Sequence, residues 1–215
     1  MGKISQGVLG GFSGNVGNVV GGSWKGIDYM RIKPASVANP RTAGQVGQRS
    51  KFSIVLNFLQ PMTEFLRVGF KLYAIKMTQF NSAMSYNLNH AVSGTYPNFV
   101  IDYASSLVSR GQLIGAIGAT ATSTTAGVVD FTWTDNSGAG KSKAKSTDKA
   151  LLLIYNDTKG IAIYDLEGAS RDSAGQTLAM PADFTGDNVE AFIGFISENR
   201  TEVADSVYIG SVTVV

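Results

Sequence analysis

The chain has 215 residues, with 18 basic and 16 acidic side chains and a formal net charge of +2. This near balance excludes a strong field for binding polyanions, and the absence of cysteine excludes disulfides, thiolate metal sites and thiol nucleophiles. Only 16% of the residues are charged, whereas 44% are hydrophobic and 25 residues are glycine. Low charge beside an ordinary apolar content favours a protein that packs against copies of itself.

Composition divides the chain into three stretches. Residues 1–31 are dense in glycine, residues 32–118 mix helix and strand patterns, and residues 119–215 resemble an all-β domain. We expect an α+β fold: an N-terminal glycine-rich extended arm and helical segment, followed by a C-terminal antiparallel β-sandwich. The sequence shows no signal peptide and no apolar run near the ~20 residues of a membrane span, which predicts synthesis in the cytoplasm without membrane insertion.

The first stretch is too apolar for a simple glycine-serine linker. One interpretation is a flexible tail. The other is an arm that packs on another surface, because aromatic and β-branched side chains stabilise interfaces. The second interpretation predicts four apolar contact residues: Val16, Val19, Val20 and Trp24.

A helix is predicted over residues 41–59, with Asn39 as its N-cap and Pro40 at its first position. Arg41, Gln45 and Arg49 are spaced four apart, so they share one polar stripe that can grip carbonyls or carboxylates of a neighbour. The alternative is a stripe that is merely solvated.

Basic side chains cluster over residues 25–51, Arg31 among them, close to Trp24 and Tyr29. Such a cluster can bind nucleic acid, but the near-neutral chain favours contacts with carbonyls or carboxylates at an interface. Arg31 is therefore a further candidate contact residue.

Proline and glycine divide the rest of the middle stretch. Pro61 ends or kinks the first helix, and a short second helix carries Met62, Phe65 and Leu66. Residues 68–77 favour irregular backbone. A helix over 78–92, capped by Gly94, precedes a turn at 96–98 and a hairpin whose strands span 99–108 and 112–117.

The last stretch shows strand-like runs separated by turn residues, at 127–134, 149–156, 160–166, 176–180, 188–197 and 205–215. This spacing is typical of a sandwich. By pattern alone, residues 119–215 resemble the fibronectin type III class. That resemblance implies that Trp133 and Tyr155, on the second and third strands, fill the core.

Motifs that carry chemistry are incomplete. The Gly138–Ser142 loop lacks the first glycine of a phosphate-binding loop, and Asp183–Asn188 lacks the spacing of a calcium loop. The single histidine, His90, lies near a predicted helix end, where a capping or packed role is expected. We predict no catalytic, cofactor-binding or metal-binding residues, no cofactor and no enzyme.

The chain is identified as a member of an uncharacterised bacterial family of unknown function. The residues that carry the resemblance are Gly-Ser-Trp-Lys-Gly-Ile at 22–27, Asn-Pro-Arg-Thr at 39–42 and Ala-Val-Ser-Gly-Thr-Tyr-Pro at 91–97. The Asn-Pro-Arg-Thr segment is also similar to small phage structural proteins, which implies a virion-like or appendage-like role. The family brings no activity or cofactor.

These observations predict a structural subunit that assembles with itself into a filament, surface appendage or phage-like particle. It would act in an extracellular assembly or a virion, with other structural proteins as possible partners and without nucleic acid. The alternative is a monomeric adhesin that binds carbohydrate or protein through the sandwich, using the aromatic residues Tyr164, Phe184 and Tyr208.

Overall fold

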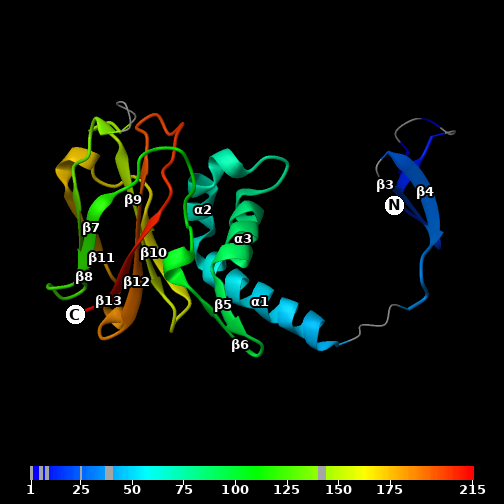
Figure 1. The fold of residues 1–215 in the computed structure, drawn as a ribbon, viewed down its shortest axis with the longest axis horizontal. Helices are drawn as coiled ribbons and strands as arrows, with labels where there is room; N and C mark the ends of the chain where they lie inside the picture. Colours follow the sequence, from blue (N-terminus) through cyan, green and yellow to red (C-terminus); the bar gives the residue numbers. More distant parts are fainter. Residues whose placement is uncertain (1, 5–6, 8–9, 25, 37–40, 140–143) are drawn as a thin grey trace. The chain divides into compact units, whose positions relative to one another are not determined.

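The computed structural model describes all residues except 1, 5–6, 8–9, 25, 37–40 and 140–143. The chain forms two compact units, Met1–Thr42 and Ala43–Val215 (Figure 1). The predicted boundary between residues 118 and 119 therefore falls inside the second unit. The predicted helix cap at Asn39 and Pro40 lies outside the described residues.

The N-terminal unit is a four-stranded antiparallel sheet rather than a single extended arm. Its strands follow one another in space as in the sequence: β1 (Lys3–Ile4), β2 (Phe12–Val16), β3 (Val19–Trp24) and β4 (Ile27–Ile32). Gly17, with φ 59°, opens the two-residue loop between β2 and β3, and Gly26, with φ 83°, lies in the next turn. Positive φ at these positions suits tight hairpins, so the segment pairs with itself.

Three α-helices begin the second unit: α1 (Ala43–Leu59), α2 (Thr63–Gly69) and α3 (Gln79–His90). Short 3₁₀ turns join them, η1 (Gln60–Met62) at Pro61 and η2 (Lys71–Tyr73). The Thr78 hydroxyl accepts a hydrogen bond from the Asn81 amide and caps α3. These helices confirm the predicted ones, except that Gly94 does not end α3, whose last turn closes at Ala91.

The predicted hairpin of residues 99–117 is wrong. Strand β6 (Asn98–Ile101) pairs instead with β5 (Val92–Thr95), which contains Gly94 at φ 86°. After η3 (Tyr103–Ser105) the chain runs beside residues 203–206, where the Val108 amide donates to Ser206 Oγ and Leu113 bridges to Ala204. Long-range partners thus replace the local turn.

Seven strands form two antiparallel sheets. One has the order β11 (Gly175–Ala179), β8 (Val128–Thr134), β7 (Ile117–Thr122). The other has the order β10 (Ile161–Asp165), β9 (Lys149–Asn156), β12 (Asn188–Ile196), β13 (Val207–Thr213), and the connections include η4 (Arg171–Ser173) and η5 (Ala182–Phe184). All six strands predicted in this region exist, whereas β7 was not predicted.

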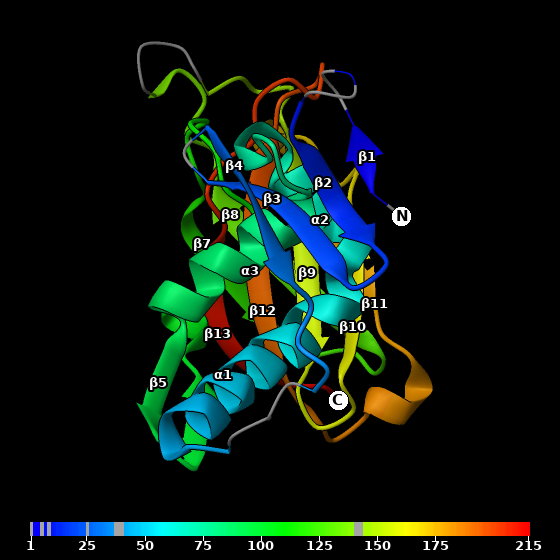
Figure 2. The ribbon, with the colours of Figure 1, turned by 90° about the vertical axis from the view of Figure 1, so that its right-hand side faces the viewer.

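The four-stranded sheet carries a hydrophobic core on each face. Between the two sheets lies one core, which includes Trp133, Leu152 and Ile154. The helices cover the opposite face and bury a second core, which includes Leu153 and Tyr155 (Figures 1 and 2). Trp133 therefore occupies the sandwich core as expected, whereas Tyr155 is buried on the helical side.

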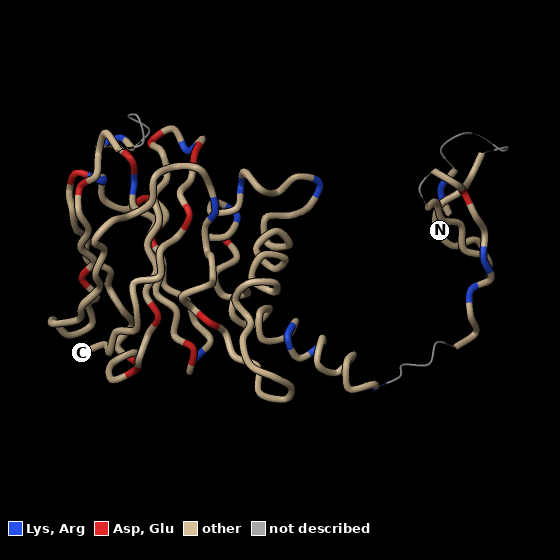
Figure 3. Tube along the Cα trace, viewed as in Figure 1, with Lys and Arg blue, Asp and Glu red and all other residues tan. Residues whose placement is uncertain are grey.

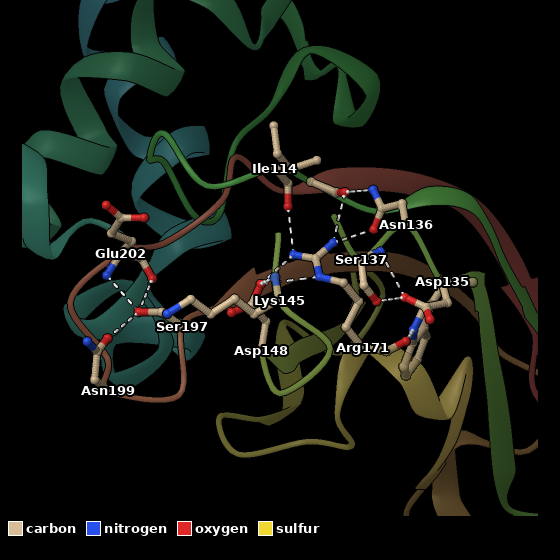
Figure 4. A network of polar contacts seen from close by, with 12 residues as sticks. Ile114, Asp135, Asn136, Ser137, Lys145, Asp148, Arg171, Ser197, Asn199 and Glu202 are labelled. Atoms are coloured by element: carbon tan, nitrogen blue, oxygen red, sulfur yellow. Dashed lines mark hydrogen bonds and ion pairs between the residues drawn. The ribbon is translucent and has the colours of Figure 1, made fainter. Parts of the chain in front are cut away.

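A buried polar network joins the connections at one end of the sheets (Figure 4). The Arg171 guanidinium donates to Asp148 Oδ2, the Asn136 side chain and the Ile114 carbonyl, and it lies 3.8 Å from the centre of the Phe195 ring. Burial lowers the pKa of Arg171, and the Asp148 carboxylate opposes that shift. The network satisfies groups that would otherwise be buried without partners.

Candidate assembly interface

The predicted contact residues of the first stretch all lie on the N-terminal sheet, but on two faces. Val16 and Val19 are directly opposite each other across β2 and β3, and so share one face. Val20 lies opposite Arg31 of β4, and strand alternation places both on the other face together with Trp24. The sequence therefore identified residues of one sheet but not the division between its faces.

The described residues of this sheet form no hydrophobic core. Neither hydrophobic core of the protein includes a residue of Met1–Thr42 among those described. All residues of β4 are exposed. Large apolar side chains of the unit are 47–76% exposed: Ile4, Val16, Trp24, Ile27, Tyr29, Met30 and Ile32. So much exposed apolar surface on one small sheet is typical of an interaction site.

Two adjacent glycines let aromatic rings lie on the sheet. A Cβ atom at Gly21 would stand 2.6 Å from the Phe12 ring, and a Cβ atom at Gly22 would stand 3.1 Å from the Tyr29 hydroxyl. Phe12 therefore covers Gly21 on one face, and Tyr29 covers Gly22 on the other. Glycine is needed where a ring or a backbone approaches this closely.

The predicted polar stripe is only partly on a helix. Gln45 and Arg49 are exposed on α1, whereas Arg41 precedes the helix, which begins at Ala43. Arg41 also belongs to the N-terminal unit, whereas Gln45 and Arg49 belong to the second. The structure thus does not present the three side chains as one helical stripe.

The aromatic residues predicted to be exposed in an adhesin are buried or half-buried. Phe184 is completely buried in the sandwich core. Tyr164 packs edge-on against Phe65 of α2, with ring centres 5.8 Å apart, and Tyr208 donates to Glu190 Oε2 at 2.5 Å. Phe184 is thus not exposed as expected, whereas Tyr164 and Tyr208 are half-buried, and binding of carbohydrate or protein through the sandwich stays a prediction.

The motifs examined for chemistry have structural roles where they are described. His90 stacks on Tyr86 at the end of α3, and its Nδ1 lies 2.8 Å from the Tyr86 carbonyl. Asp187, in the segment Asp183–Asn188, forms an ion pair with Lys159 at 2.6 Å. Residues 140–143, which include the end of the Gly138–Ser142 loop, lie outside the described residues. Within the described residues, no cluster of three or more His, Asp or Glu side chains could hold a metal ion.

A pocket that the sequence did not indicate opens where β9 ends. It has a volume of about 330 Å³ and lies between α1, β6 and η3, with Asn57, Tyr103, Tyr155 and Asp157 among its lining residues. Burial and the Asp157 carboxylate raise the pKa of Tyr155 to about 12, and the same causes raise that of Tyr103 well above its usual range. No pattern in the sequence indicates this pocket, because its lining comes from several separate segments of the chain.

Comparison with known proteins gives a family without an assigned function. Residues 11–210 match the family of unknown function DUF6266. The chain belongs to that family. This confirms the predicted membership of an uncharacterised family, while the similarity to phage structural proteins stays a prediction. No curated protein matches the chain.

Among solved structures, the fn3 domain of the human collagen alpha-1(XX) chain is similar over 47% of this chain and 86% of that domain. The sequence identity is 10% and the TM-score is 0.34. Among the helices in the described part of the DUF6266 chain, none combines the length and apolar character that a membrane span requires.

Proposed function

We propose that this DUF6266 protein is a structural subunit that assembles with copies of itself, as part of a filament, a surface appendage or a phage-like particle. The N-terminal sheet would be the contact surface. The exposed apolar side chains of that sheet carry the proposal, because a single-layer sheet without a core gains little stability until another surface covers it.

We further propose that the seven strands β7 to β13 of the second unit form a fibronectin type III-like sandwich. Their order supports this: three strands, β11-β8-β7, face four strands, β10-β9-β12-β13, and Trp133 of the second strand lies in the shared core. Such a sandwich would serve as a rigid body that presents the assembly surfaces outside the cell or in a virion.

The size of the purified full chain as a function of concentration tests the assembly. Light scattering should show particles much larger than the 22.7 kDa monomer. The double variant Trp24→Thr and Ile27→Thr keeps strand-forming residues but removes apolar surface from one face, and it should shift the particles towards monomer. A wild-type chain that stays monomeric at high concentration would contradict the proposal.

A further inference from the structure

The pocket between α1, β6 and η3 has walls suited to a flat cation. The Phe58 ring contacts Tyr103 and Tyr155 edge-on, with ring centres 5.6 and 5.1 Å apart. Phe99 of β6 completes the aromatic lining, and Asp157 supplies a carboxylate on the exposed side. Aromatic faces beside a carboxylate attract guanidinium and ammonium groups through cation–π and charge-assisted contacts.

Three carboxylates around this pocket form no ion pair among the described residues. Asp157 lies in the pocket. Burial is the main cause that raises the pKa values of Tyr103 and Tyr208, and nearby carboxylates add to it, Glu190 at Tyr103 and Asp102 at Tyr208. Among the ion pairs of the described residues, none includes these three carboxylates. The nearby Lys159 is already paired with Asp187 at 2.6 Å. Lys51 Nζ lies 4.9 Å from the centre of the Phe99 ring, so an incoming cation would share that ring with Lys51 but would meet carboxylates that form no ion pair.

The two units of the chain carry opposite net charges. Residues 1–42 hold 5 basic and 1 acidic side chains, a net charge of +4, and residues 43–215 hold 13 basic and 15 acidic side chains, a net charge of −2. In Figure 3, blue segments of the trace mark the described Lys and Arg residues of the N-terminal unit. Opposite charges favour a contact between the N-terminal unit of one copy and the second unit of another.

Within the N-terminal unit, Arg31 combines a cation with apolar surroundings. It lies on β4, the exposed edge strand of the sheet, on the face that also carries Trp24, Ile27 and Tyr29. The hairpin of β5 and β6 beside the pocket offers matching apolar surface, with Val100 57% and Tyr96 52% exposed. Arginine suits such a site better than lysine because its planar group stacks on rings and forks onto a carboxylate.

We propose that the pocket of Tyr103, Tyr155 and Asp157 receives the Arg31 guanidinium of a second copy of the chain. This proposal rests on the proposed function and names the surface to which the N-terminal sheet binds. The contact would be head to tail, since the two partners use different surfaces, and repeated contacts of this kind generate rings or filaments.

Charge reversal in the full chain tests the contact. Arg31→Glu and Asp157→Lys should each raise the concentration required for assembly by about tenfold or more, because each places like charges together. A mixture of the two variants should assemble again, because each offers the other an opposite charge. Glu198→Lys, at an exposed carboxylate away from the pocket, is the matched control and should assemble as the wild type does.

Circular dichroism should show that every variant keeps its fold. Asp157→Asn removes the charge of this carboxylate without reversing it, and is thus a milder change than Asp157→Lys. Assembly that survives both charge reversals would overturn this contact and leave the proposed function intact. Rescue by the double variant in one chain, without rescue by mixing, would place the contact within one chain and also overturn the proposal. A monomeric wild type would instead overturn the proposed function itself.

Discussion

Arg171 and Asp148 form an ion pair that the protein encloses completely. Their Nη2 and Oδ2 atoms lie 3.1 Å apart, and the two side chains are 0% and 1% exposed. The second carboxylate oxygen, Asp148 Oδ1, is buried and has no hydrogen-bond partner among the described residues. The Arg171 guanidinium thus supplies the counter-charge of this buried carboxylate, and the Lys145 amide donates a further hydrogen bond to Oδ2.

Replacing Arg171 with Met should therefore destabilise the second unit strongly. The change leaves Asp148 buried without its counter-charge, which costs about 3–5 kcal/mol in comparable pairs. Denaturant unfolding measures the difference. The control is Arg67→Met at the exposed Arg67–Glu64 pair, which should cost less than about 1 kcal/mol. Equal losses in the two variants would contradict this account of the buried pair.

Leu152 and Leu153 test whether the helices and the sandwich unfold together. The side chains point into different cores, but both belong to β9. Leu152→Ala and Leu153→Ala should each lower the free energy of unfolding by about 2–5 kcal/mol and shift one common transition. Two separate transitions, each sensitive to one variant, would show instead that residues 32–118 and 119–215 are independent domains.

Gly21→Ala should disrupt the N-terminal sheet, whereas Gly22→Ala should be tolerated better. An alanine methyl at Gly21 meets the Phe12 ring and backbone, whereas at Gly22 it meets the end of the Tyr29 side chain, which can move aside. Amide hydrogen exchange over β2 to β4 measures the loss of protection. The second unit should keep its protection in both variants, and similar exchange in the two variants would contradict the geometry.

Tyr155 should make stability fall in alkaline solution. Its folded pKa of about 12 lies above the ordinary value of 10.0, so the unfolded chain loses this proton first. The contribution of Tyr155 to the free energy of unfolding is complete at a pH below the ordinary pKa, and it is lost as the pH rises through the folded pKa. Tyr155→Phe should reduce the slope of unfolding free energy against pH in this window, and Asp157→Asn should reduce it less because burial remains. An unchanged slope in Tyr155→Phe would contradict the pKa shift.

Strands β8 to β13 were predictable because turn residues bracket them. Strand β9 matches its predicted bounds, and its uninterrupted apolar run Ala150–Tyr155 also signals burial on both faces. A sandwich alone would show alternation there. The helical cover was nonetheless missed, because it depends on packing between segments that are distant in the sequence.

In the N-terminal unit, by contrast, the fold was not predicted from the sequence. Glycine and exposed Trp24 suggested an arm, although Gly17 with Asn18 is an ordinary two-residue hairpin turn. The pocket of Tyr103 and Asp157 was beyond sequence reasoning, since β6, η3 and the end of β9 meet only in the folded chain. Local turns can thus be inferred from the sequence, whereas sites built from several segments cannot.

The position of β9 has a consequence for biosynthesis. Helices α1 and α2 leave the ribosome early, yet the strands that cover their apolar side chains, β9 and β12, begin at residues 149 and 188. Because these strands are synthesised after the helices, the nascent chain holds an uncovered helical layer until most of the protein has been made. Translation speed through residues 90–190 thus governs how long this layer is open to chaperones or to premature association with neighbouring nascent chains.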